Sequence, residues 1–295
     1  MQELVSTISL GSIYLLFALG LSLTWGTIDI LNFAHGAIFM FSTFTAYLVL
    51  GHIQLPLVAV ILIGIVVGAV LSLLIQVLAF EPILKRARTK RSAEMQILIG
   101  GIGIATIPLA IAEEQTKSNP FGLTGSTFSV NVWHLGSVRI TNIAVLTIIV
   151  GLLLWGATAL WFRRSKQGLA LRSIGVDSEV SSLMGINRRQ LALVTMAVSG
   201  GMAGLAGILF TASLGAITPE SGDILLIKAF AIIILGGVGS MVGVAFGAFA
   251  LAFVETLVLT HTSGSWTDAV AFGLIFLVLL ARPAGLFGRK EVRRA

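Results

Sequence analysis

Long uncharged stretches dominate the pattern of hydrophobic and polar positions along this chain. No charged residue lies between Glu3 and Asp29, between Asp29 and Glu81, or between Arg189 and Glu220. A helix needs roughly 20 mainly apolar residues to cross the hydrocarbon core of a bilayer. Lipid offers the backbone no hydrogen bonds, so only helices or closed barrels cross it, and barrel segments have only about ten residues. The pattern therefore predicts an all-α, polytopic bundle of transmembrane helices.

The apolar stretches predict about nine membrane crossings, within a range of about 8–10. We expect them near residues 8–26, 33–50, 55–80, 95–113, 142–162, 190–213, 225–238, 243–260 and 266–281. The seventh stretch is short and ends in a glycine-rich break, so it could instead form one discontinuous helix with the eighth. Since no long polar segment interrupts the series, residues 1–295 are predicted to form a single membrane-spanning domain.

The distribution of charge predicts how the chain is oriented. Only 11% of the residues are charged, against about 25% in soluble proteins. The net charge of +6 would suit nucleic acid, but most Lys and Arg fall into three clusters, at 85–91, 163–189 and 282–294, each directly after an apolar stretch. Such clusters mark cytoplasmic segments. We therefore expect no nucleic-acid partner, a cytoplasmic loop at about 163–190, an external loop at about 114–141, an external N-terminus and a cytoplasmic C-terminus.

Several motifs of enzymes and nucleotide-binding proteins are absent from the sequence. There is no G-x-x-x-x-G-K-[ST] loop for ATP, no H-E-x-x-H pair among the four scattered histidines and no G-x-S-x-G elbow. There are also no cysteines to bind a metal as thiolates. We therefore expect neither a cofactor nor a metal in this chain, and no enzymatic activity of its own.

Charged residues within the apolar stretches bear on the source of energy for any transport. The candidates are Asp29, Lys228, Glu255 and Asp268, and the last three are expected near helix ends. Ion-coupled transporters usually carry ionisable residues deep in their membrane spans. No carboxylate is expected at the membrane centre here, which favours a machine driven by a partner subunit over a stand-alone secondary transporter or channel.

The link between the first two predicted helices carries three polar residues, Asp29, Asn32 and His35. Their three-residue spacing places them roughly on one helical face. Polar groups at membrane depth usually face a bundle interior or a water-filled cavity, which would make them part of a substrate path or a gate. Alternatively, they form hydrogen bonds that hold the first helix against the second. The sequence leaves both interpretations open.

The predicted cytoplasmic loop contains the pattern of a short amphipathic helix. Asp177 can cap its start, Glu179 complements the dipole in its first turn, and Gly185 suits the left-handed residue that ends it. Between them an apolar stripe follows the spacing i, i+3, i+4: Val180, Leu183 and Met184. Such a helix either docks in a groove of another protein or lies on the membrane surface, where neighbouring arginines would meet anionic headgroups.

Two further patterns concern the external side and the helix contacts. Glu113, Glu114, Glu220 and Asp223 form acidic positions on predicted external segments, where they either meet a basic patch of a delivery protein or are simply solvated. Glycines also recur at helical spacing in two stretches: Gly200, Gly204 and Gly207 in one, and Gly239, Gly243 and Gly247 in the other. Such stripes let helix backbones approach closely, or line a transport path.

Five short motifs, in order along the chain, resemble those of LivH-type permease subunits of branched-chain amino acid ABC importers. They are GSIY at 11–14, NFAHG at 32–36, MGIN at 184–187, LGGVGS at 235–240 and RPAGLF at 282–287. The resemblance covers essentially the whole chain. It implies a subunit of the bacterial cytoplasmic (inner) membrane that translocates branched-chain or related neutral amino acids.

The resemblance also implies partners and a coupling site. The partners would be a second, LivM-like permease, two cytoplasmic ATPase subunits that bind the ATP, and an extracytoplasmic substrate-binding protein. The segment that seats on an ATPase would comprise Asp177, Glu179, Val180, Leu183, Met184, Gly185 and Ile186. The exact ligand stays open, because similar permeases are associated with Leu, Ile and Val, other neutral amino acids, urea or short amides, and aromatic acids.

Overall fold

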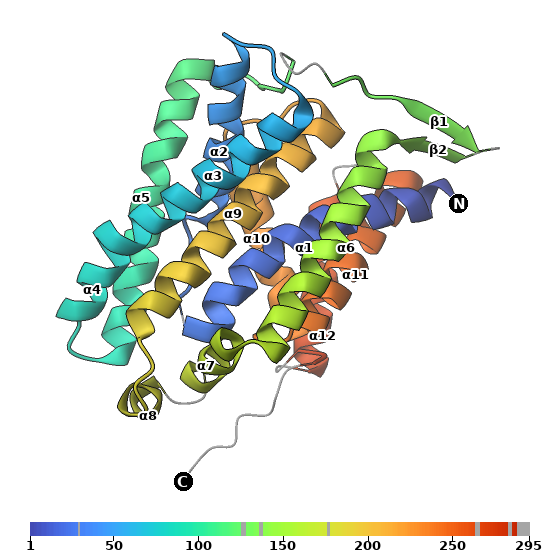
Figure 1. Ribbon diagram of the computed structural model, residues 1–295. Helices are drawn as coiled ribbons and strands as arrows, with labels where there is room; N and C mark the ends of the chain where they lie inside the picture. The colour runs from blue at the N-terminus through green and yellow to red at the C-terminus, as the bar shows by residue number, and fades with distance from the viewer. Residues whose placement is uncertain are drawn as a thin grey trace.

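Helices run the length of the molecule in the computed structural model (Figure 1), which describes residues 1–28, 30–124, 128–135, 138–175, 178–262, 266–282 and 285–287. The long elements are α1 (Gln2–Ile28), α2 (His35–Leu50), α3 (Leu57–Ile75), α5 (Lys90–Thr116), α6 (Asn142–Arg164), α9 (Arg188–Leu214), α10 (Ser221–Gly236), α11 (Met241–His261) and α12 (Thr267–Ala281). A single π-helical turn, Gln76–Phe80, joins α3 to the short α4 (Glu81–Arg86). Each predicted apolar stretch therefore contains a helix.

Within the described part of the chain, six helical segments are long and apolar enough to cross a membrane. They are the segments 2–26, 57–86, 91–116, 142–164, 188–214 and 241–261. The helices α2 and α10 have 16 residues each and α12 has 15, so length alone does not qualify them. The fold is a polytopic membrane helix bundle, and the prediction of about nine crossings depends on these three shorter helices.

The two ends of the bundle differ in charge and in structure (Figure 1). At one end lie α4, α7 (Lys166–Ile174) and α8 (Ser178–Leu183), together with the basic clusters at 85–91 and 163–189. We call it the basic end. At the opposite, hairpin end, β1 (Val132–Leu135) pairs with β2 (Val138–Thr141). These two clusters thus lie at the same end, as the positive-inside rule predicts for segments on one side of a membrane, and most of the third cluster, 282–294, lies outside the described residues.

The two short strands were not expected from the sequence, which predicted only a loop at 114–141. They are antiparallel, with His134 opposite Arg139. The free edge of β2 is occupied by the side-chain amide of Gln2, whose Nε2 donates to the Arg139 carbonyl oxygen at 3.1 Å and whose Oε1 accepts from the Arg139 amide at 2.8 Å. The N-terminus is therefore fastened to the hairpin, a contact across 137 positions that no local pattern predicts.

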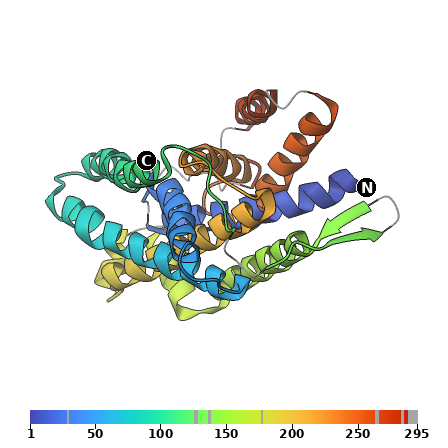
Figure 2. The ribbon, with the colours of Figure 1, turned by 90° about the horizontal axis from the view of Figure 1, so that it is seen from above.

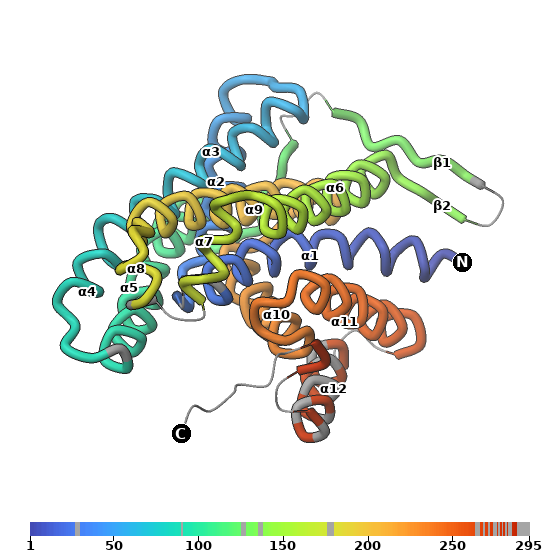
Figure 3. The backbone as a smooth tube through the Cα atoms, turned by 60° about the horizontal axis from the view of Figure 1, so that its bottom comes forward, coloured from blue at the N-terminus to red at the C-terminus, as the bar shows by residue number. Residues whose placement is uncertain are grey.

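Helix α1 occupies the centre of the bundle. Every residue from 11 to 24 is buried. The helix packs against α6 and α9 on one side and against α10 and α11 on the other (Figure 3). Seen from above, α12 lies at the periphery beside the α10–α11 pair (Figure 2). The buried residues of α1 include the small polar Ser12, Ser22 and Thr24, residue types that mark helix contacts in membrane bundles.

Glycines make the closest helix contacts, as the sequence predicted. A Cβ atom added at Gly200 or Gly204 of α9 would overlap the carbonyl oxygen of Gly68 or Gly64 of α3. One at Gly207 would lie 2.6 Å from the Phe39 carbonyl oxygen of α2. The packing interpretation of this stripe is confirmed, since any side chain would force the helices apart.

Helices α10 and α11 form an antiparallel hairpin. Gly243 lies against Gly236, and a Cβ atom at Gly247 would lie 2.6 Å from the carbonyl oxygen of Ile232. The chain reverses between the helices through Gly237 (φ 93°) and Gly239 (φ 77°), conformations that favour glycine. The alternative of one discontinuous helix is therefore wrong, and the glycine-rich break is a turn.

Candidate functional site

Two of the three polar residues predicted between the first helices meet at the start of α2. Asn32 and His35 are both fully buried, and Asp29 lies outside the described residues. The His35 Nε2 lies 3.2 Å from the Phe17 carbonyl oxygen of α1, and its Nδ1 lies 3.5 Å from the Ser199 hydroxyl of α9. A carbonyl oxygen can only accept, so Nε2 donates to it and Nδ1 accepts from Ser199. His35 therefore joins three helices.

Asn32 holds the link in place but keeps one polar group unsatisfied. Its Oδ1 accepts from the Ala34 amide at 3.1 Å, and its carbonyl oxygen accepts from the His35 amide at 3.2 Å. Its Nδ2 is buried and has no hydrogen-bond partner among the residues that the structure describes. The contacts of His35 support the packing interpretation. The buried Nδ2 of Asn32 supports the path interpretation, because water in a path or a polar group of a substrate would satisfy it.

A buried charged cluster joins α1, α10 and α11. The Lys228 ammonium lies 2.9 Å from Oε1 of Glu255, and the Tyr14 hydroxyl donates to Oε2 of Glu255 at 2.5 Å. The ammonium also lies 3.4 Å from the Tyr14 hydroxyl oxygen. The carboxylate is 2% exposed and the lysine side chain 13%, so the cluster presents its positive side outward.

The expectation that Lys228 lies near a helix end was wrong. Helix α10 begins at Ser221 rather than near 225, which places Lys228 two turns inside it. Glu255 lies in the last two turns of α11, near a helix end as expected, and its carboxylate is buried. The pairing of oppositely charged residues inside a membrane could have indicated the contact, but no spacing connects positions 14, 228 and 255.

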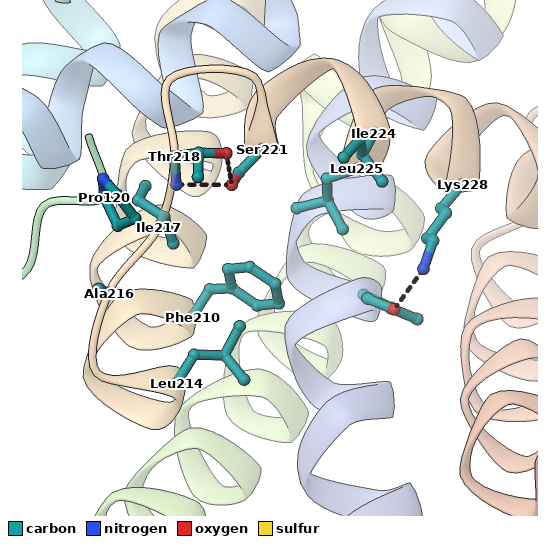
Figure 4. Close-up of a pocket in the computed structure, with 11 residues that line it drawn as sticks. Pro120, Phe210, Leu214, Ala216, Ile217, Thr218, Ser221, Ile224, Leu225 and Lys228 are labelled. Carbon is teal, nitrogen blue, oxygen red and sulfur yellow. Dashed lines mark hydrogen bonds between the residues drawn. The ribbon is translucent and has the colours of Figure 1, made fainter. Parts of the chain in front are cut away.

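A cavity of about 270 Å³ lies beside this cluster at the hairpin end (Figure 4). Its wall is formed by α1, the end of α9, the start of α10 and the loop before Phe121. That loop is paired with the α9–α10 connection, since the Phe121 and Ile217 backbones exchange two hydrogen bonds of 2.9 Å. The lining side chains are mostly apolar, with Tyr14, Thr218, Ser221 and Lys228 as the polar members.

The predicted acidic positions lie at the hairpin end. Glu220 and Asp223 are exposed at the start of α10, and Asp223 directly precedes the cavity residue Ile224. At the end of α5, Glu114 is exposed and Glu113 is partly buried. The structure thus places these four carboxylates on one end of the bundle. Among the described residues, no group of three or more His, Cys, Asp or Glu could hold a metal ion.

At the basic end, α8 ends as the sequence predicted. Gly185 has a φ of 83°, its amide donates to the Ser182 carbonyl oxygen at 3.0 Å, and the Ile186 amide donates to that of Ser181 at 3.2 Å. These two bonds define a Schellman motif. Asp177 lies outside the described residues, and the side chain of Glu179 is not described, so their capping roles stay predictions.

The predicted apolar stripe on α8 is exposed. Leu183 is 87% exposed, Met184 80% and Val180 54%. We call these three residues the apolar tip. Behind the tip, Ile186 packs against the buried cluster of Leu171 and Ile174 of α7 and Leu191 of α9. The tip is therefore an outward-facing apolar surface on an anchored support.

The support of the tip reaches the centre of the bundle through three glycines. A Cβ atom at Gly175, just after α7, would lie 3.3 Å from the Gly26 carbonyl oxygen near the end of α1. One at Gly26 would lie 2.6 Å from Cα of Gly239 in the α10–α11 turn. The end of α7 thus contacts α1, and α1 contacts the turn between α10 and α11, the two helices that carry Lys228 and Glu255.

The long apolar helices, with polar groups buried among them, define a multi-pass helical membrane protein. The family described as branched-chain amino acid transport system / permease component matches residues 4–279, and the chain belongs to this family. Its members are permease subunits of ABC importers, which work with ATPase and substrate-binding partners.

Three curated branched-chain amino acid permeases match the chain over most of their length. The chain is 30% identical to the high-affinity branched-chain amino acid transport system permease protein LivH of Escherichia coli, over 100% of the chain and 97% of the relative. It is 29% identical to BraD of Pseudomonas aeruginosa, with the same coverage. A probable branched-chain amino acid transport permease protein LivH of Methanocaldococcus jannaschii is 30% identical, over 94% of the chain and 89% of the relative. No solved structure matches the chain.

Proposed function

We propose that this chain forms part of the membrane passage through which an ABC importer moves branched-chain or related neutral amino acids, and that ATPase partners drive it through the apolar tip. The family and the printed names of the relatives support the substrate class. The observation that carries the coupling proposal is the exposure of Leu183 and Met184 on an anchored segment of the basic end.

The physical chemistry of the apolar tip favours a protein partner. An exposed leucine or methionine side chain gains roughly 1.5–3 kcal/mol when it is fully buried. The tip lies at the end of the bundle that carries the basic clusters, beyond the long apolar helices. A groove on a cytoplasmic ATPase would cover it, with the other predicted coupling residues, Asp177, Glu179, Gly185 and Ile186, shaping the segment.

The packing behind the tip supports a route for transmitting movement. Force applied at α8 reaches α7 through the cluster around Ile186, and α7 rests on the end of α1 at Gly26. From there it reaches the α10–α11 turn at Gly239. Closely packed elements of this kind shift as rigid units rather than deform continuously. ATP-driven closure of the ATPase pair would thus tilt α1 and the α10–α11 hairpin together.

The remaining partners follow from the same proposal. A LivM-like second permease would complete the passage, and two ATPase subunits would seat below the pair. An extracytoplasmic binding protein would deliver the substrate to the hairpin end, where Glu113, Glu114, Glu220 and Asp223 could meet basic residues. Asp29, Asn32 and His35 would contribute to a path or gate at the start of α2.

The coupling proposal is tested with the assembled complex. In the double variant Leu183→Glu plus Met184→Glu, we expect the chain to reach the membrane but to lose most ATPase co-purification and ATP-dependent uptake. The matched control is Val130→Glu plus Val132→Glu, which changes two exposed valines, 55% and 45% accessible, at the opposite end of the molecule. Intact ATPase co-purification and uptake in the tip variant would refute the assignment.

The transport proposal itself is tested in proteoliposomes. The complex with both permeases, the ATPases and the binding protein should take up leucine, isoleucine or valine only when ATP is supplied to the ATPase side. Uptake of urea, short amides or aromatic acids in place of these amino acids would show that the proposed substrate class is wrong. Gradient-driven flux through the purified chain alone would instead establish a stand-alone transporter or channel.

A further inference from the structure

We propose that the cavity at the hairpin end is a binding subsite for a zwitterionic amino acid, in which the Lys228 ammonium holds the carboxylate of the substrate and the apolar wall holds its side chain. This inference rests on the proposed function and assigns it a place in the structure. The cavity combines three properties that such a ligand requires: a fixed positive charge, a neighbouring acceptor and an apolar surface.

The polar side of the cavity matches the two charged groups of an amino acid. Lys228 lines the cavity, while its partner Glu255 is almost fully buried and is not among the lining residues. The ligand therefore meets the cation first. Tyr14 also lines the cavity, and its hydroxyl, which donates to Glu255, lies 3.4 Å from the Lys228 ammonium. The Tyr14 oxygen accepts from Lys228 and, as an acceptor with two lone pairs, can also accept from the substrate ammonium while Lys228 donates to the substrate carboxylate.

The apolar side of the cavity matches an aliphatic side chain. Phe210 and Leu214 come from α9, and Ile224 and Leu225 from α10 (Figure 4). Specific small-molecule pockets have this composition: a mostly apolar lining with a few placed polar groups. Drug-sized ligands occupy pockets of roughly 300–1,000 Å³. A cavity of about 270 Å³ therefore suits a solute as small as a single amino acid.

The location of the cavity agrees with a role in transport. Its lining includes Ser221 and Ile224 at the start of α10, next in sequence to the exposed Glu220 and Asp223, where a binding protein would release its cargo. Its walls belong to α1, α9 and α10, and two of these helices meet the route from the apolar tip. Movement of α1 together with the α10–α11 hairpin against α9 would change the cavity, which connects substrate binding with ATP-driven switching.

A purely structural ion pair is the competing explanation, and charge-paired variants separate the two. Lys228→Met or Glu255→Gln alone leaves one buried charge without its partner, so both are expected to reduce the amount of folded complex under either explanation. The double variant Lys228→Met plus Glu255→Gln removes both charges. We expect it to restore the folded complex to near the wild-type amount while ATP-dependent leucine uptake stays at least tenfold lower.

Recovery of uptake together with folding in the double variant would overturn the proposal, because the pair would then serve only packing. Lys228→Arg gives a second measurement, since it keeps the positive charge. It should retain more uptake per folded complex than the double variant. Equal uptake of Lys228→Arg and the double variant would also count against a carboxylate site.

Cysteine labelling tests occupancy of the cavity directly, because the chain contains no cysteine. Ile224→Cys places a thiol in the cavity wall, and Ile227→Cys on the same helix is the matched control. The two isoleucines are 50% and 52% exposed, but only Ile224 lines the cavity. The reaction of each thiol with a maleimide is read from the band of this chain in the assembled complex.

With leucine and the binding protein present, the labelling rate at position 224 should fall severalfold while the rate at position 227 stays unchanged. Equal rates with and without leucine at both positions would overturn the subsite. The wild-type complex is assayed for ATP-dependent leucine uptake in parallel. If the complex takes up leucine but leucine does not slow labelling at position 224, only the subsite is refuted. If the complex takes up no amino acid at all, the proposed function itself is refuted.

Discussion

Helices α1 and α3 look alike in sequence but occupy opposite environments. Both are long and apolar, yet 67% of the most apolar window of α1 is buried inside the protein against 28% for α3. The mean hydropathy of α3 is the higher of the two, 3.1 against 2.0. The more hydrophobic helix is therefore the more exposed one, the reverse of the order in a water-soluble protein.

The difference follows from the nature of the bilayer as a solvent. Lipid tails are as apolar as a leucine side chain, so hydrophobicity does not drive one helix into the interior of the bundle. What separates the two faces of α3 is side-chain size. Its inner face carries Gly64 and Gly68 against α9, whereas its outer face carries large aliphatic residues at four-residue spacing: Val58, Leu62, Val66, Val70 and Leu74. Small and polar residues thus mark the interior.

The largest expected effect is the loss of the close contact between α3 and α9. In Gly204→Leu the new side chain would overlap the Gly64 backbone, so the helices must separate and we expect destabilisation of about 3 kcal/mol. The measurement is the yield and melting temperature of the detergent-solubilised complex. Gly103→Leu on α5 is the control, because nothing lies within 4 Å of a Cβ atom there. Similar losses in both variants would contradict the importance of the contact.

A smaller effect is expected where a polar group marks the interior. His35→Ala removes the hydrogen bond to the Phe17 carbonyl oxygen. It also removes the contact between the His35 and Phe17 rings, whose centroids lie 4.6 Å apart. We expect destabilisation of about 2 kcal/mol and a larger fall in uptake than in expression, since the start of α2 loses its fixed position.

The control for this variant is His52→Ala, which changes an exposed histidine just after α2. Uptake and membrane expression are measured on the same preparations, so that transport is expressed per folded molecule. A fall in uptake that only parallels the fall in expression would support packing as the sole role of His35. The same result would remove it from the proposed gate.

The smallest expected effect lies on the outer face of α3. Val66 is 58% exposed, and lipid can fill the space that Val66→Ala leaves, so the free energy of unfolding should change by less than about 0.5 kcal/mol. Val60 on the same helix is fully buried, and Val60→Ala should cost about 1–3 kcal/mol through the cavity it creates. Equal melting temperatures for the two variants would contradict the distinction between the inner and outer faces of α3.

Local sequence patterns determined much of this protein. The uncharged stretches predicted the helices, because each crossing must satisfy its own backbone within one continuous segment. The basic clusters predicted which segments gather at one end, and the glycines at positions 200, 204 and 207 predicted close helix contacts. The residues around Gly185 were enough to predict the end of α8, because its hydrogen bonds join positions only three and five residues apart.

Only the tertiary structure decided which distant residues meet. The Tyr14–Lys228–Glu255 cluster joins α1, α10 and α11, and the cavity lies between α1, α9 and α10. The Gln2–Arg139 contact joins residues 137 positions apart. Such contacts depend on how the helices are ordered around α1. In a bilayer the apolar pattern carries no information on that order, since every helix face is compatible with lipid. The order is set by small residues and by buried polar groups, whose partners lie far along the chain.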